Sequence, residues 1–223
     1  MKKILFFILI LPTFLFSQNT VTRNLGDFNK IKIYDLINLK LVQSDLNRVE
    51  ISGTHANEVQ LINKYGKLKI RMSLPKIFKG DDVLVTLYYK SIQAIDANEG
   101  AYIYSDNLIQ VNSFDCRAQE GARVEINIKT SYLESRSYSG AIINLNGEAQ
   151  AQLIKVNTGG VVKAQNLKTT DSEVIIRAGG EVEVYASGKL TADIKAGGKV
   201  YVYGDPKMVS KSKLLLGKVT LMN

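Results

Sequence analysis

The chain has 223 residues, of which 45% are hydrophobic and 22% charged, with 17 Gly and three Pro. These values are ordinary for a globular protein and exclude a collagen-like chain or a Pro-rich disordered one. The net charge is +8, or +6 without Lys2 and Lys3, and the other Lys and Arg residues are spread along the chain. This modest charge indicates a solvated surface or a weak attraction to acidic polysaccharide or anionic lipid headgroups, and we expect no nucleic-acid partner.

The first 17 residues have the pattern of a secretory signal peptide. Two lysines precede an apolar run that ends at Phe16, and a small Ser17 is followed by a polar residue. The run is shorter than the roughly 20 residues that a membrane-spanning helix needs, so we expect cleavage after Ser17 rather than a membrane anchor. Residues 18–26 are then a loose leader. The mature protein is expected in the periplasm, on the outer membrane surface or outside the cell, without a transmembrane helix.

Residues 27–90 carry short runs in which apolar and polar residues alternate, for example around Ile31 and Ile33 or around Val49 and Ile51. Alternation with a period of two predicts strands that have one buried face. Turn-forming Gly, Asn, Asp and Ser residues separate the runs. No 20-residue repeat is visible here, so we expect an N-terminal β cap that contains the first rungs and covers the end of the repeats that follow.

Residues 91–223 repeat a six-residue pattern: Gly, Ala or Gly, any residue, apolar, any residue, apolar. The first glycines of six copies follow one another at steps of 21, 19, 19, 20 and 18 residues, and a seventh copy covers residues 216–221. A period near 20 residues is typical of solenoid proteins. We expect the glycines to form the corners, because a residue without Cβ takes unusual backbone angles and avoids its stacked copies. The predicted corner glycines are Gly100, Gly121, Gly140, Gly159, Gly160, Gly179, Gly180, Gly197, Gly198 and Gly217.

Alternating residues on both sides of each corner predict a strand, a glycine corner and a second strand in every repeat. When the repeats stack, residues at equivalent positions of successive repeats lie above one another, and the apolar ones are buried. One predicted inner ladder is Ile103, Val124, Ile143, Val162, Val182, Val200 and Val219. The next is Ser105, Ile126, Leu145, Ala164, Val184, Val202 and Leu221. The sequence thus predicts an all-β, right-handed parallel β-helix with rungs of roughly 20 residues, in one domain from 27 to 223.

The chain has one cysteine and one histidine, which excludes an internal disulfide framework and a zinc site built from these residue types. Cys116 falls in the inner slot that it shares with Ile95, Ile154 and Val174, so we expect a buried, unreactive thiol. His55 lies in a predicted turn and is expected to be an ordinary polar loop residue. We expect no bound metal and no cofactor.

Carboxylates are candidate catalytic groups because β-helices include enzymes that cleave polysaccharides. Asp96, Asp106 and Asp115 do not share one rung position. Glu99 and Glu120 do share one, which places their carboxylates roughly 5 Å apart. That spacing suits a glycosidase or a bound cation, and it equally suits a solvated pair beside a turn. With no Ser-His-Asp set and no nucleotide-binding fingerprint in the chain, we expect no catalytic residue and no enzyme.

Outward positions carry a mixture of charged and aromatic residues, and tyrosines gather in the last rungs. Tyr185, Lys199, Tyr201 and Tyr203 fall within two adjacent rungs. Tyrosine rows can stack on sugar rings or on protein partners, and tyrosine is also a good strand former. The candidate ligand surface is therefore these four residues, and its candidate partners are glycans or cell-surface proteins.

The glycine corners resemble those of the bacterial family called putative auto-transporter adhesin, head GIN domain. The resemblance rests on tandem Ser-Gly-Ala and Gly-Gly-x-Val-x-Val corners, above all on residues 179–206, and it extends over roughly residues 27–221. It implies an exported β-helical protein of a Bacteroidota-type bacterium. The usual Gly-Ser-Gly-Asp corners are absent, because Ala, Val, Glu or Lys replaces Asp, which argues against calcium at the corners.

Together, these observations favour a non-enzymatic exported envelope protein that acts as an adhesin or another surface-binding protein. Two alternatives stay open. One is a carbohydrate-active protein that binds, or cleaves as a lyase or hydrolase, a polysaccharide. The other is a purely structural envelope protein.

Overall fold

The structure is a computed structural model that describes residues 20–222, with residues 213–215 described by their backbone alone. The expected signal peptide, residues 1–17, lies outside the described residues. No helix among residues 20–222 is long and apolar enough to cross a membrane. Two one-turn 3-10 helices accompany 16 strands. The elements are β1 Val21–Asn24, β2 Lys30–Ile33, β3 Asn38–Gln43, β4 Arg48–Ser52, η1 Ala56–Glu58, β5 Val59–Lys64, β6 Lys67–Met72, η2 Leu74–Lys76, β7 Leu84–Tyr89, β8 Ala94–Ala97, β9 Tyr102–Gln110, β10 Ser113–Ala118, β11 Arg123–Tyr138, β12 Ile142–Asn157, β13 Val161–Ile176, β14 Glu181–Tyr185, β15 Lys189–Tyr203 and β16 Met208–Leu221.

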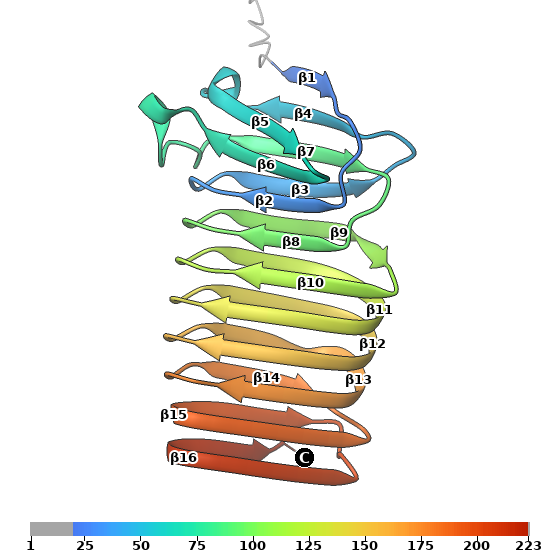
Figure 1. The fold of residues 1–223 in the computed structure, drawn as a ribbon, viewed down its shortest axis with the longest axis vertical. Helices are drawn as coiled ribbons and strands as arrows, with labels where there is room; N and C mark the ends of the chain where they lie inside the picture. The colour runs from blue at the N-terminus through green and yellow to red at the C-terminus, as the bar shows by residue number, and fades with distance from the viewer. Residues whose placement is uncertain (1–19, 223) are drawn as a thin grey trace, which may run out of the picture.

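The chain winds into a flattened β-solenoid, as the repeat predicted (Figure 1). Each rung passes through a front sheet, which contains β2, β6, β8 and β10, and returns through a back sheet, which contains β3, β7, β9 and β14. The strands of successive rungs pair in parallel. The corner from front to back carries the glycines, and we call it the glycine edge. The opposite corner is the far edge, around which β11, β12 and β13 run without interruption.

The second predicted inner ladder is only partly confirmed, because register shifts separate Ser105 from Ile126 and Leu145 from Ala164, and Leu221 at its end is 49% exposed. The first predicted ladder is confirmed. Ile103, Val124 and Ile143 are register partners in successive rungs, and this ladder continues without a break to Val219. Leu39 of β3 and Val85 of β7 extend the same ladder into the cap. These side chains are fully buried as far as Val200, so the core is one continuous apolar column between the two sheets.

At the corner of residues 179–180, glycine is favoured at the two positions for different physical reasons. Gly179 has a φ of +65°, the left-handed conformation, and a Cβ placed on it would meet no atom within 4 Å. Its backbone conformation alone therefore favours glycine. Gly180 has a φ of +127°, and a Cβ there would lie 2.3 Å from Cγ1 of Val156 in the preceding rung. The second glycine is thus required by close contact between rungs as well.

The unequal repeat steps all fall at the far edge. In the first step, Tyr104 pairs with Glu125 and Leu108 with Asn127, so the rung of β9 holds two residues more than the rung of β11. A register shift after Asn144 gives β13 one extra residue relative to β12. The differences in rung length therefore lie at the far edge, although the glycine edge also changes: its positive-φ pair is Thr158–Gly159 in one corner and Gly179–Gly180 in the next. The far edge is therefore the variable surface of the solenoid.

The cap is built differently from its order in the sequence. The rung of β2 and β3 lies between the rung of β6 and β7 and the rung of β8 and β9. Three antiparallel pairings close this end: β5 with β6, β4 with β7, and β1 with β4. The expected loose leader is thus partly wrong, because Val21–Asn24 within it is strand β1. These antiparallel strands cover the edges that a bare first rung would expose.

Candidate functional site

The four residues predicted as a ligand surface lie on the outward side of the back sheet. Tyr185 of β14 and Tyr203 of β15 are register partners in adjacent rungs, and Tyr201 lies two residues before Tyr203 on the same outward side. The three tyrosines are half-buried and Lys199 is exposed. The prediction that these side chains face outward on neighbouring rungs is therefore confirmed.

The four residues do not, however, converge on one point. Lys199 is four residues from Tyr203 along β15, a separation of about 13 Å. Its register partners in the neighbouring rungs are Glu181 and Lys218. Tyr185 lies at the other end of the sheet, where β14 stops at the far edge. The structure thus separates Tyr185 from Lys199 and places it beside a different set of side chains.

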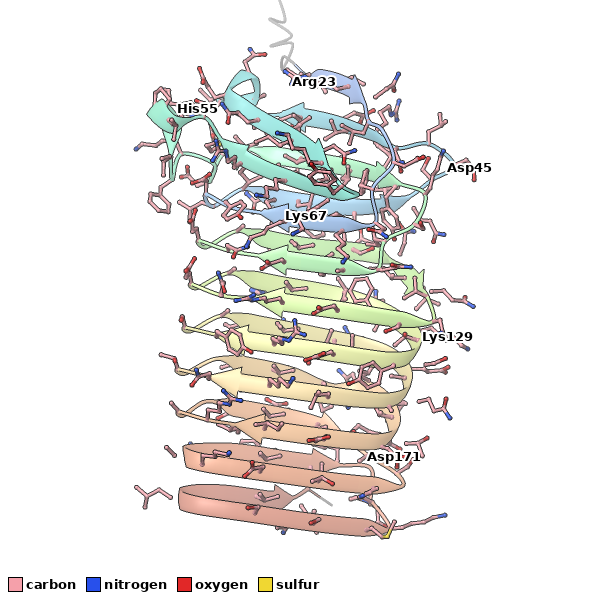
Figure 2. The ribbon with its side chains drawn as sticks, viewed as in Figure 1. Arg23, Asp45, His55, Lys67, Lys129 and Asp171 are labelled. Atoms are coloured by element: carbon pink, nitrogen blue, oxygen red, sulfur yellow. The ribbon has the colours of Figure 1, made fainter. Side chains whose placement is uncertain are left out.

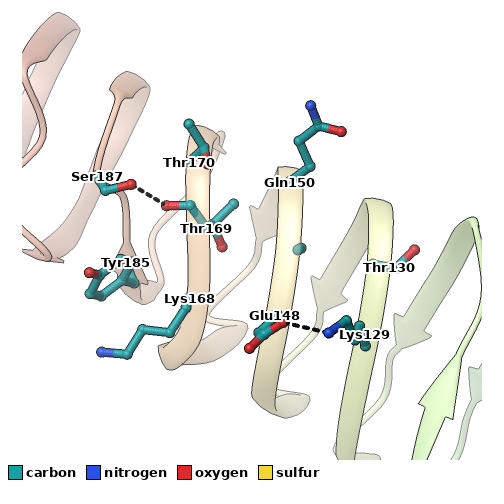
Figure 3. Close-up of a pocket in the computed structure, with 10 residues that line it drawn as sticks. Lys129, Thr130, Glu148, Gln150, Lys168, Thr169, Thr170, Tyr185 and Ser187 are labelled. Carbon is teal, nitrogen blue, oxygen red and sulfur yellow. Dashed lines mark hydrogen bonds and ion pairs between the residues drawn. The ribbon is translucent and has the colours of Figure 1, made fainter.

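That set lines a shallow hollow of about 390 Å³ on the far edge, which we call the edge groove (Figure 3). A second hollow, of about 460 Å³, shares Lys129 and Thr130 with it and continues along the edge to residues 110–112. Both are lined mainly by hydroxyl, amide and charged groups. The residues of the edge groove are Lys129, Thr130, Glu148, Ala149, Gln150, Lys168, Thr169, Thr170, Tyr185 and Ser187.

The hollow has a simple cause in chain length. Ala164 pairs with Val184, and Asp171 pairs with Lys189. The chain therefore takes seven residue steps from Ala164 to Asp171 but only five from Val184 to Lys189 in the next rung. Tyr185 and Ser187 belong to this shorter rung, and they line the groove together with residues of the three preceding rungs.

Tyr185 closes one end of the edge groove together with Lys168. The Lys168 ammonium lies over the Tyr185 ring, with Nζ 4.2 Å from the ring centroid. The ring also packs on Gly204, where an added Cβ would lie 2.6 Å from Cε2 of Tyr185. These two contacts fix the ring, so the part of the half-buried Tyr185 side chain that stays exposed is presented in a defined orientation.

A buried polar network holds the backbone beneath Tyr185. The Gln152 amide Nε2 lies 3.0 Å from the hydroxyl oxygens of Thr169 and Ser172 and 3.3 Å from the Tyr185 carbonyl oxygen, so its two N–H groups are shared among three acceptors. The Ser172 hydroxyl donates to the same carbonyl at 2.8 Å. The Ser187 backbone N–H donates to the Thr169 carbonyl at 3.0 Å. These bonds span three rungs, so the floor of the groove is rigid before any ligand arrives.

The charges of the groove nearly cancel. Lys129 and Glu148 form an ion pair at 3.0 Å, and their side chains are 54% and 64% exposed. Lys168 supplies a further cation. The described residues contain no group of three or more His, Cys, Asp or Glu side chains placed to hold a metal ion. The groove can donate and accept hydrogen bonds and offer one aromatic face, and its floor holds no titratable group.

The predicted carboxylate pair lies elsewhere. Glu99 and Glu120 occupy the same place in successive glycine corners, as the sequence indicated, with φ of +54° and +58°. Burial, together with the nearby carboxylates of Asp35 and Glu120, raises the pKa of Glu99. Both residues directly precede corner glycines, Gly100 and Gly121, and therefore lie on the glycine edge rather than at the edge groove.

Sequence reasoning found Tyr185 but missed Lys168, Gln150, Thr170 and the other groove residues. They lie at the far edge, where no glycine pattern marks the corner. The one available signal was the short 18-residue step between Gly179 and Gly197, which is the rung that cuts the corner.

The fold and the groove define a β-solenoid with a polar recess along one edge. The family described as putative auto-transporter adhesin, head GIN domain, matches residues 27–206, and the chain belongs to this family. The resemblance seen in the glycine corners is thereby confirmed. No curated protein matches the chain.

Solved structures share the fold. A putative adhesin from Bacteroides fragilis has 20% sequence identity and a TM-score of 0.84, over 92% of this chain and 98% of that one. A putative adhesin from Parabacteroides distasonis has 18% identity and a TM-score of 0.75, over 92% and 97% of the two chains. One from Parabacteroides merdae has 17% identity and a TM-score of 0.72, over 94% and 98%.

Proposed function

We propose that this protein is an exported, non-enzymatic binding protein of the adhesin type, and that its edge groove binds a segment of a glycan chain. The observation that carries the proposal is the fixed Tyr185 ring, with Lys168 over it, at the end of a groove lined by hydroxyls and amides. Export is supported by the predicted signal peptide and by membership of a family described as adhesins.

The chemistry of the groove fits a sugar better than an apolar ligand. An aromatic face packs against the C–H face of a pyranose ring, while hydroxyls and amides exchange hydrogen bonds with its hydroxyls. The groove is open along the rungs, so a chain of sugars can lie in it without a closed pocket. Its nearly balanced charge favours a neutral or weakly acidic glycan.

The test is a glycan array and intact-cell binding with wild type and Tyr185→Ala. We expect the variant to lose about tenfold in affinity, since losing one well-placed aromatic contact costs about 1.4 kcal/mol. Tyr65→Ala is the matched control, because Tyr65 is fully exposed at the turn between β5 and β6. Equal binding by Tyr185→Ala and wild type would exclude the groove.

Two further measurements distinguish the alternatives. The double variant Tyr201→Ser with Tyr203→Ser tests the rest of the predicted tyrosine surface, and a loss confined to this variant would place the site on the back sheet. A turnover screen on acidic polysaccharides tests for an enzyme, and cleavage by wild type would overturn the non-enzymatic proposal. Absence of binding to every glycan and cell type would favour a structural envelope protein.

A further inference from the structure

A second surface, at the cap, carries an unbalanced positive charge. In the front sheet, Lys67 of β6 lies opposite Lys64 of β5 on one side and Lys30 of β2 on the other, and Lys69 lies opposite Lys32. Like charges directly opposite one another destabilise a sheet. We call these five lysines the cationic face, and Lys67 marks its position in Figure 2.

Acidic partners are scarce on this face. Lys32 pairs with Asp96 at 3.1 Å. For Lys30, Lys64, Lys67 and Lys69, no carboxylate of residues 20–222 lies within ion-pair distance. The four side chains are exposed. Folding does not require lysine at these positions, because any polar residue that faces outward would be compatible with the same strands.

The same sheet shows the contrast further along the solenoid. There Asp115 lies opposite Glu134, and the cations Arg136 and Lys155 neutralise this pair at distances of 2.8–3.1 Å. In this part of the front sheet, opposite charges on the outward face are therefore paired. The cationic face lacks this pairing, because four of its five lysines have no such carboxylate of residues 20–222 beside them.

An apolar loop projects beside the cationic face. Leu74, Ile77 and Phe78, between β6 and β7, are 70%, 43% and 54% exposed. Phe78 has a φ of +59°, which is unusual for a bulky residue. Backbone hydrogen bonds from Lys76 to Ser73 and from Lys79 to Lys76 order the loop. The loop therefore holds large apolar side chains in water at a cost, which indicates a partner surface.

The two features meet in one hollow. A recess of about 430 Å³ is lined both by the basic residues Lys64, Lys69 and Arg71 and by Leu74, Ile77 and Phe78 of the apolar loop. Asp35 and Glu99 also line it. The Asp35 carboxylate accepts a hydrogen bond from the Met72 backbone N–H at 2.9 Å. The open rim thus joins cations directly to exposed apolar side chains.

We propose that the cap docks on a lipid bilayer that carries anionic headgroups. The cationic face lies against the headgroups, and Leu74, Ile77 and Phe78 enter the boundary with the acyl chains. Basic residues beside apolar ones are the combination that binds an anionic interface. A soluble acidic polymer would use the lysines but would leave the apolar loop in water, so the loop favours the bilayer. Docking through the cap leaves the edge groove, in the later rungs, free.

The test is co-sedimentation of the protein with vesicles of phosphatidylcholine mixed with phosphatidylglycerol, and with vesicles of phosphatidylcholine alone. We expect binding to the anionic vesicles only, and weaker binding as salt is added. Lys67→Gln with Lys69→Gln should reduce partitioning by at least tenfold, because each lysine near such a surface contributes substantially. Phe78→Asn should also reduce it. Asn tolerates positive φ, so this variant keeps the loop conformation.

Lys163→Gln with Lys207→Gln is the matched control, since both lysines are exposed and lie outside the cap. Thermal unfolding of every variant checks that the fold is intact. Equal binding to both vesicle types, or equal loss in the control, would overturn the proposal. Full binding by Phe78→Asn, together with displacement by a soluble acidic polysaccharide, would assign the face to an acidic polymer instead.

Discussion

Arg136 joins its own rung to Asp115 of the preceding one. Its Nη1 donates to both Asp115 carboxylate oxygens, at 3.0 and 3.1 Å, and its Nε donates to Glu134 at 2.9 Å. Lys155 of the following rung donates to the same Glu134 oxygen at 2.8 Å. One guanidinium and one ammonium thus tie three rungs of the front sheet together on the outward face.

The two carboxylates of this network differ in their titration. Burial alone would raise the pKa of Glu134, but hydrogen bonds from Lys155 and Arg136 outweigh burial and hold it below the ordinary value of 4.5. Burial raises the pKa of Asp115, and Arg136 only partly opposes this effect. Ionised Glu134 therefore stabilises the folded state, whereas ionised Asp115 does not.

The first prediction follows from this difference. Glu134→Gln should lower the free energy of unfolding at pH 7 by about 1 kcal/mol, whereas Asp115→Asn should change it by no more than about 0.5 kcal/mol. Because the pKa of Glu134 is lowered by folding, its contribution is complete above pH 4.5 and is lost as the pH falls through its folded value. Urea unfolding of both variants at several pH values checks this. A larger effect for Asp115→Asn would contradict it.

The second prediction concerns the single cysteine. Cys116 is fully buried between Ile95 and Ser135 of the neighbouring rungs, and burial raises the pKa of its thiol. The thiolate is the reactive form, so we expect the native protein to react with a thiol reagent only on the timescale of unfolding. The measurement compares labelling in buffer with labelling in denaturant. Rapid labelling in buffer would show that the front sheet opens locally.

Much of the fold can be predicted from the period of the sequence repeat alone. Val124, Ile143 and their equivalents alternate with polar residues at fixed distances from a glycine, and stacking then determines their neighbours. The cap could not be predicted in this way. Its β2–β3 rung lies between segments that come later in the chain, and no periodic signal encodes that order.

The candidate site likewise has a part that the repeat predicts and a part that it does not. Tyr185 and Tyr203 were found because they occupy outward positions of a regular pattern, which the register confirms. Lys168 was missed because its contact with Tyr185 crosses the irregular far edge, where a deletion sets the geometry. Period fixes positions within sheets, whereas contacts across a variable corner depend on the three-dimensional path of the chain.

The third prediction tests the assignment of inner and outer faces. Val182 is fully buried in the inner ladder, and Glu183 beside it points outward and is half-buried. Val182→Asp buries a charge among apolar side chains and should lower the free energy of unfolding by several kcal/mol. Glu183→Ala should change it by no more than about 0.5 kcal/mol. Thermal unfolding of both variants decides, and equal melting temperatures would reverse the assignment.

The last prediction separates the two reasons for glycine at one corner. Gly179 needs only its left-handed conformation, which Asn tolerates, so Gly179→Asn should cost no more than about 1 kcal/mol. Gly180→Ala puts a side chain on backbone with a φ of +127°, and in addition it places the methyl group against the Val156 side chain, at 2.3 Å, and 2.6 Å from the Gly160 carbonyl oxygen. Backbone of the stacked rung cannot withdraw without breaking the parallel pairing, so a cost of 3 kcal/mol or more, about that of severe overpacking, is expected.

Denaturant unfolding of the two variants measures both costs, and Val156→Ala in the Gly180→Ala background supplies the decisive control. Shortening Val156 removes the nearer of the two contacts but leaves the Gly160 carbonyl in place. If side-chain crowding dominates, the double variant regains part of the stability that Gly180→Ala loses, and the two changes are not additive. If Gly179→Asn proves the more damaging change, backbone conformation rather than contact between rungs dictates the corner.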